Sequence, residues 1–133
     1  MIKHLQVAVG VIVNAQQEVL IARRQAHQHQ GNLWEFPGGK REPEESRLDA
    51  LKRELQEEVG LLVEKAEDLF QVEHDYTDRK VTLDVWLVEQ FSGEIAGREG
   101  QEIKWCPLNA LDEHEFPAAN SAIVSAVKSY YQN

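Results

Sequence analysis

The sequence predicts an α/β fold in which a mixed β-sheet is covered by helices on both faces, as an α/β/α sandwich. Short segments rich in Val and Ile are bounded by polar turns, which is typical of strands. Two separated segments carry apolar residues at helical spacing and interrupt the strands. A chain of 133 residues is long enough to bury a substantial core, so we expect a single domain over residues 1–133.

The expected strands share β-branched and aromatic residues and lie between turn-forming segments. They are predicted at residues 5–13, 19–24, 33–37, 68–76 and 80–91, and in a segment that ends at Trp105–Cys106. The turn at 77–79 makes the two longest of these strands a hairpin.

Both helices are indicated by their apolar spacing and by their ends. Ser46 followed by Asp49 predicts a helix start, and Gly60 predicts its termination. The apolar stripe of this first helix is Leu48, Leu51, Leu55 and Val59. The second helix is expected at residues 119–131. Its apolar side is predicted to be Ala122, Ile123, Ala126, Val127 and Tyr130.

Three acidic residues of the first helix lie beside its apolar stripe. At about 100° per residue, Glu54, Glu57 and Glu58 fall within roughly a third of the helix circumference. Like charges this close repel one another unless a cation binds among them. Mg²⁺ prefers carboxylate oxygens and keeps part of its coordination for substrate phosphates. The pattern therefore predicts a magnesium-dependent enzyme that acts on phosphates, unless the acids form a solvated face balanced by nearby lysine and arginine.

A longer spacing around these acids resembles the signature of the Nudix hydrolases. Its fixed positions are Gly39, Glu45, Arg53, Glu54, Leu55, Glu57, Glu58, Gly60 and Leu61. The resemblance implies the Nudix fold, which agrees with the predicted sandwich. Outside the signature, further segments resemble the bacterial MutT group of this superfamily. These segments are residues 5–10, 23–24, 35–40, 97–101 and 116–120.

The MutT resemblance implies that 8-oxo-dGTP is hydrolysed to 8-oxo-dGMP and pyrophosphate, by attack of water on the β-phosphorus. It implies Mg²⁺ as the cofactor, with Mn²⁺ as a substitute. The implied metal ligands are the carbonyl of Gly38 and the carboxylates of Glu57, Glu58 and Glu99. Glu54 is the expected general base, oriented by Arg53, or else a further metal ligand. Glu99 also fits a mobile charged loop.

The same resemblance implies a set of nucleotide contacts. They are Arg24, His29, Glu35, Phe36, Pro37, Gly38, Arg79 and Asn120. Arg79 equally fits a solvated turn, and Phe36 alone would be interpreted as a core residue. Residues 33–36 also resemble Nudix pyrophosphatases that act on CTP or 5-methyl-dCTP. Hydrolysis of another nucleoside triphosphate is therefore the alternative activity, and a Nudix binding module without turnover is a third hypothesis.

Asn120 is the residue that best fits recognition of an oxidised guanine. Guanine presents two acceptors, O6 and N7, and oxidation at C8 turns N7 into an N–H donor. An asparagine amide offers one donor and one acceptor side by side, so it matches the oxidised edge. The alternative is that Asn120 caps the second helix, since asparagine is a favoured N-cap.

Composition limits the partners. Fourteen basic against 23 acidic residues give a net charge of −9, which argues against binding a nucleic-acid polymer. No apolar run reaches the roughly 20 residues of a membrane span, and the N-terminus does not resemble a signal peptide. The single cysteine, Cys106, is interpreted as a core thiol. We expect a cytoplasmic monomer whose partner is a small nucleoside triphosphate.

Overall fold

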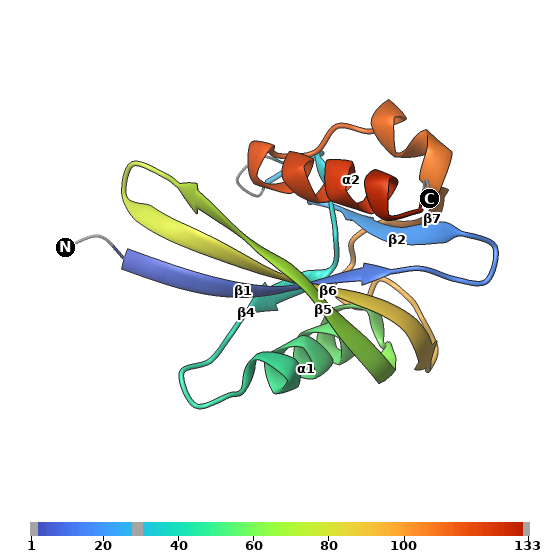
Figure 1. Cartoon of the computed structure of the whole chain (residues 1–133), viewed down its shortest axis with the longest axis horizontal. Coiled ribbons are helices and arrows are strands. Elements are labelled where there is room, and N and C mark those ends of the chain that lie inside the picture. Colours follow the sequence, from blue (N-terminus) through green and yellow to red (C-terminus); the bar gives the residue numbers. More distant parts are fainter. Residues whose placement is uncertain (1–2, 28–30, 132–133) are drawn as a thin grey trace.

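The computed structural model describes residues 3–27 and 31–131 of the chain (Figure 1). In chain order the elements are β1 Lys3–Ile12, β2 Glu18–Arg23, β3 Trp34–Glu35, β4 Gly38–Lys40, α1 Arg47–Val59, β5 Leu62–Asp75, β6 Arg79–Ser92, β7 Ile103–Pro107, the 3₁₀ helix η1 Leu108–Glu113, and α2 Ala118–Tyr131.

The strands form a mixed sheet and a smaller antiparallel one. The larger sheet has the order β4-β1-β6-β5, in which β1 and β6 are parallel and the other neighbours antiparallel. The smaller sheet has the order β3-β2-β7. Figure 1 shows α1 on one side of the strands and α2 on the other, so the predicted sandwich is confirmed. The strands count as two sheets because the chain segments of β1 and β2 are hydrogen-bonded to each other only through the isolated bridge between Val13 and Val19.

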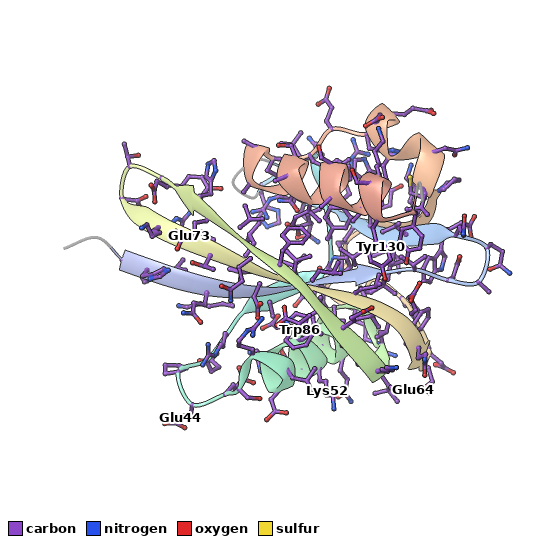
Figure 2. All side chains as sticks on the ribbon, viewed as in Figure 1. Glu44, Lys52, Glu64, Glu73, Trp86 and Tyr130 are labelled. Carbon is purple, nitrogen blue, oxygen red and sulfur yellow. The ribbon has the colours of Figure 1, made fainter. Side chains whose placement is uncertain are left out.

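Two hydrophobic clusters lie on opposite faces of β1, as the alternation of a strand dictates. Val9 and Val11 pack in the cluster that includes Ile123 of α2. Ala8 and Ile12 pack in the cluster that includes Leu55 of α1. Trp86 belongs to this second cluster and lies between the strands and α1 in Figure 2. The mixed sheet therefore contributes one face to each of the two cores.

Helix α1 has the ends that its sequence predicts. The Ser46 hydroxyl oxygen accepts a hydrogen bond from the Asp49 N–H at 3.1 Å. Gly60 adopts a left-handed conformation with φ of 71° and closes the last turn. Leu51, Leu55 and Val59 are fully buried, which confirms the predicted stripe and fixes the face that carries the acids.

Two elements differ from the prediction. Strand β5 begins at Leu62 and not at residue 68, because its charged first residues pair with β6 through the main chain alone. The buried stripe of α2 is Ala119, Ile123, Val124 and Val127. Ala122 and Tyr130 are exposed. Apolar residues occupy more of the α2 circumference than the strands can cover, so periodicity alone did not show which side is buried. Cys106 is a buried free thiol, as predicted.

Within residues 3–27 and 31–131, no helix is long and apolar enough to cross a membrane.

Candidate active site

Glycine at position 39 creates the space in which the Glu54 carboxylate lies. Gly39 of β4 is opposite Ala8 of β1, and α1 packs against this part of the sheet. A Cβ atom on Gly39 would lie 2.0 Å from Oε2 of Glu54, far inside van der Waals contact. The glycine of the signature is therefore required by the carboxylate above it.

Arg53 connects four parts of the signature. Its Nε and Nη2 donate to the two carboxylate oxygens of Glu45 at 2.6 and 2.8 Å. Its Nη1 donates to Glu54 at 2.7 Å and to Glu57 at 3.2 Å. Its Nη2 also donates to the carbonyl oxygen of Lys40 at 3.0 Å. Such a forked arrangement fixes the guanidinium, and with it the orientation of Glu54.

Glu45 was not among the predicted site residues, although its spacing in the signature pointed to it. The hydrogen bonds from Arg53 and from the Glu42 N–H lower the pKa of Glu45 to about 2. Glu45 is thus a permanent anion that holds Arg53 in place.

Glu58 is the most buried acid of the helix, with 6 % of its surface exposed. Its Oε2 accepts a hydrogen bond from the Gly38 N–H at 2.9 Å. Burial above all, with smaller contributions from the charges of Glu35, Glu99 and Glu54, raises the pKa of Glu58 to about 8 against the effect of that hydrogen bond. Across the described residues, Glu58 has no ion pair with a lysine or arginine.

The neighbouring acids Glu54 and Glu35 each pair with an arginine, yet their pKa values are raised as well. Burial raises the pKa of Glu54, although Arg53 opposes the shift, and Glu57 and Glu99 add to it. Burial likewise raises the pKa of Glu35 against its ion pair with Arg24, in which Nη1 and Oε1 are 2.7 Å apart. Negative charge therefore accumulates around Glu58.

The glycine-rich loop after β6 brings Glu99 to this place. The Arg98 N–H donates to the carbonyl oxygen of Glu58 at 3.0 Å, and the Ala96 N–H donates to that of Val59. The loop is thus docked on the C-terminal end of α1. A small cavity beside it is lined by Arg23, Gln25, Glu35, Glu58, Glu99 and Gln101. The docking argues against the alternative of a free charged loop.

Phe36 and Pro37, which are predicted to line the base pocket, connect β3 to β4. Phe36 is buried, and its ring stacks on Phe116 with centroids 5.3 Å apart. The Pro37 carbonyl oxygen accepts from the Gly10 N–H at 2.8 Å. The ring of Phe36 is therefore part of the core. A ligand could contact Phe36 only through its main-chain atoms.

Asn120 does not cap α2. The helix begins at Ala118, so Asn120 lies in its first turn, and its N–H donates to the Pro117 carbonyl at 2.8 Å. Its side chain is partly buried and has no hydrogen bond among the described residues. The capping alternative is therefore wrong, and the amide is free of that role.

Arg79 lies apart from the carboxylates. It begins β6 opposite Lys3, and strand alternation places it on the α2 side with Val81. Its guanidinium lies over the Tyr76 ring at 5.4 Å, and its buried Nε has no partner among the described residues. It is six residues, about 20 Å, from the part of β6 beside the site. His29 lies outside the described residues.

Comparisons with known proteins agree with this geometry. The family model for the NUDIX domain matches residues 8–126. The chain belongs to the Nudix family. It is 44 % identical to the 8-oxo-dGTP diphosphatase of Escherichia coli K12 over 126 residues, which cover 95 % of this chain and 98 % of that protein.

Two further comparisons concern substrate and fold. The chain is 38 % identical to the CTP pyrophosphohydrolase of E. coli K12, over 83 % of this chain and 82 % of that protein. A solved structure from a study of MutT from Aliivibrio salmonicida and Vibrio cholerae superposes with a TM-score of 0.85. It is 37 % identical and covers 97 % of this chain and 100 % of its own. The Nudix fold is thus confirmed.

Nudix hydrolases generally use a divalent metal ion, and the acids of this chain fit one. Their donors are hard oxygens, and buried Glu58 lacks a counter-ion. In the part of the chain that the structure describes, no three acidic, histidine or cysteine side chains lie close enough to hold an ion together. Glu57 instead is 57 % exposed and turns to Arg53. Mutual repulsion explains this separation, and a cation would reverse it.

Gln25 and Gln101 were not predicted as site residues. Gln101 belongs to the MutT-like segment 97–101, but neither glutamine carries a charge that would mark it as part of a phosphate site. Their place depends on how the loop docks, which spacing along the chain does not show.

Proposed function

We propose that this Nudix hydrolase is an 8-oxo-dGTP diphosphatase, which converts 8-oxo-dGTP to 8-oxo-dGMP and pyrophosphate. The gathering of Glu54, Glu58 and Glu99 at one end of α1, with buried Glu58 lacking a lysine or arginine partner among the described residues, supports the reaction class. The 44 % identity to a curated 8-oxo-dGTP diphosphatase over nearly the whole chain carries the substrate.

Each acid has a proposed role. Glu57, Glu58, Glu99 and the Gly38 carbonyl hold Mg²⁺ (or Mn²⁺), which neutralises phosphate charge and lowers the pKa of bound water. Glu54 removes the proton from the attacking water, because its raised pKa brings it nearer to neutrality and Arg53 fixes its orientation. The alternative for Glu54 is a ligand to the ion.

The nucleotide is held from the α2 side of the mixed sheet. The Asn120 amide donates to O6 and accepts from N7–H of the oxidised base, and its freedom from helix capping supports this role. Phe36 and Pro37 line the base pocket through their main chain. Arg24, His29 and Glu35 contact the sugar and phosphates, and Arg79 contacts the nucleotide away from the metal-bound phosphates. A normal guanine would present a lone pair to the Asn120 oxygen, and such mismatches discriminate strongly.

The test is a nucleotide panel with purified protein and Mg²⁺, in which the products from 8-oxo-dGTP, dGTP and CTP are identified. We expect the highest kcat/KM for 8-oxo-dGTP, with the monophosphate and pyrophosphate as products. Asn120→Ala should reduce the preference for 8-oxo-dGTP over dGTP, by a larger factor than it reduces the rate on dGTP.

The similarity to a CTP pyrophosphohydrolase supports a second candidate, the same chemistry on a pyrimidine triphosphate. A higher kcat/KM for CTP than for 8-oxo-dGTP would contradict the first proposal and establish this one. If no nucleotide is hydrolysed in Mg²⁺, the third hypothesis, a Nudix binding module without turnover, would be supported instead.

We further propose that residues 1–133 act as one domain and as a monomer, which removes an oxidised precursor from the cytoplasmic nucleotide pool and so protects DNA replication. A net charge of −9 supports a small nucleotide, and not a nucleic-acid polymer, as the partner. Light scattering of the purified protein tests the monomer.

A further inference from the structure

Two glutamine side chains hold the main chain of Glu99 from opposite sides. Oε1 of Gln101 accepts a hydrogen bond from the Glu99 N–H at 2.9 Å. Nε2 of Gln25 donates to the Glu99 carbonyl oxygen at 3.1 Å. Across the described residues, the Glu99 main chain has no other hydrogen bond. The position of this acid therefore depends on the two glutamines.

Gln101 also reaches α1. Its Nε2 donates to the carbonyl oxygen of Glu58 at 3.2 Å. One side-chain amide thus bridges the main chains of Glu58 and Glu99, which come from different elements. Both glutamines line the small cavity together with these acids. Together with the hydrogen bond from the Arg98 N–H to the same Glu58 carbonyl oxygen at 3.0 Å, the bridge holds the loop against the helix beside these acids.

The chemistry of the bridge fits an amide in particular. Bridging a carbonyl to an N–H requires one donor and one acceptor on the same side chain, which glutamine has. A carboxylate only accepts, and a lysine or arginine only donates and would neutralise the acids around it. Glutamine can fix two carboxylates without changing their charge.

The acids Glu58 and Glu99 must be held in place because their negative charges repel one another. Each of Glu58 and Glu54 has its pKa raised in part by the charge of Glu99. Glu99 is exposed and lies between Gly97 and Gly100, where glycine lowers the stiffness of the chain. Gly100 has φ of +82°, and a Cβ there would lie 3.3 Å from Nε2 of Gln25. The Arg98 N–H still holds the preceding residue to Glu58, so without the glutamines we expect repulsion to turn the Glu99 peptide and its side chain away from Glu58.

We propose that Gln101, assisted by Gln25, is a positioning residue that holds Glu99 beside Glu58 before a divalent cation binds. This inference rests on the proposed function, in which these two acids hold the ion. Removing a residue that hydrogen-bonds to a metal ligand and fixes its orientation typically weakens metal affinity by about 10–100-fold.

The experiment compares wild type with Gln101→Met and Gln25→Met, which keep an unbranched side chain but lose the amide. Gln56→Met is the matched control, because Gln56 is exposed on α1 and its side chain has no hydrogen bond among the described residues. Two quantities are measured in each variant. They are hydrogen exchange of the Glu99 amide in metal-free protein, and the Kd for Mn²⁺ by electron paramagnetic resonance.

For Gln101→Met we expect about tenfold faster exchange at the Glu99 amide, since one hydrogen bond is lost. We expect a Kd for Mn²⁺ about 10–100-fold higher. Gln25→Met should raise the Kd less, and Gln56→Met should change neither quantity.

Wild-type exchange and Mn²⁺ affinity in Gln101→Met would overturn the inference while the proposed function stands. If Gln101→Met does not fold, Gln25→Met decides, and an unchanged Kd for Mn²⁺ there overturns it. If the wild type itself binds no Mn²⁺ and hydrolyses no nucleotide, both the inference and the proposed function fail.

Discussion

At the scale of single residues, the geometry of the site depends on the glycines that lack a Cβ atom as well as on the charged side chains. Gly39 leaves room for the Glu54 carboxylate, and the Gly38 N–H donates to Glu58. Arg53 then fixes Glu54 from the other side at 2.7 Å. The orientation of the proposed base therefore depends on the space that the absence of a Cβ atom at position 39 leaves.

Gly39→Ala tests this dependence. Position 39 does not need a left-handed backbone, so alanine should be tolerated by the main chain, but its Cβ would displace Oε2 of Glu54. We expect kcat to fall by about 100-fold, because displacements near 1 Å have that effect on positioned groups. Kinetics with 8-oxo-dGTP and a thermal melt measure the outcome.

Gly10→Ala is the matched control, since its Cβ would meet side-chain carbons of Leu55 at 3.0 and 3.3 Å and of Ile12 at 3.5 Å, and not a carboxylate. It should keep most of kcat. Full activity in Gly39→Ala would show that Glu54 does not act from its present position.

At the scale of elements, α1 is anchored at its first turn by a buried ion pair. Arg47 donates from Nε and Nη2 to both oxygens of Asp84 on β6, and also to Asp68 at 2.9 Å. Nε1 of Trp86 donates to Asp84 at 3.1 Å. Asp84 lies opposite Ala8, which in turn lies opposite Gly39. Asp84, which anchors α1, and Gly39, which leaves room for the Glu54 carboxylate, thus lie in one row of paired residues across the sheet.

The anchor predicts a pH-dependent loss of stability in Asp84→Asn. Burial raises the pKa of Asp84, but hydrogen bonds from Arg47, Trp86 and Gln71 outweigh it and hold that pKa below its ordinary value. A carboxyl whose pKa is lowered by folding stabilises the protein above its unfolded pKa of about 3.9 and loses that contribution as the pH falls. Asp84→Asn should cost about 1–3 kcal/mol at pH 7, a value reduced because Arg47 is partly exposed.

Urea denaturation at pH 7, 5 and 3 measures this effect. The difference in unfolding free energy from wild type should persist at pH 5 and shrink at pH 3. Asp75→Asn, on an exposed residue of β5, should show little effect at any of the three. A loss in Asp84→Asn that stayed the same at all three pH values would exclude the ionised pair as its cause.

The elements also show what local sequence can reveal. Helix α1 follows from its cap, stripe and terminator, because each of these acts within a few residues. Strand β4 does not, because Gly38–Lys40 lacks strand-forming side chains and exists through its pairing with β1. Likewise, spacing identified the acids of α1, but the glutamines beside Glu99 depend on the docking of a distant loop.

At the scale of the whole molecule, one sheet separates two cores that stabilise each other. Leu55 of α1 and Ile123 of α2 are both fully buried, on opposite faces of β1. Neither helix can bury its apolar stripe without the shared strands. We therefore expect the site at the end of α1 and the proposed nucleotide side near α2 to belong to one cooperative unit.

Leu55→Ala and Ile123→Ala test that cooperativity. Each should reduce the free energy of unfolding by about 2–5 kcal/mol, because each leaves a cavity in a packed core. Both should shift the same single transition, as expected for a domain of this size. Circular dichroism and tryptophan fluorescence would then report coincident curves in urea. Two separate transitions in either variant would mean that the cores fold independently.

The central claim is that the acids of α1 repel one another in the metal-free protein and bind a divalent cation that offsets this repulsion. The most direct measurement is calorimetric titration of Mg²⁺ into metal-free wild type and Glu58→Gln. Glu73→Gln is the control, since Glu73 lies on the projecting hairpin away from α1 (Figure 2). We predict saturable binding to wild type and to Glu73→Gln, and its loss in Glu58→Gln. Equal binding by Glu58→Gln, or none by the wild type, would contradict the account.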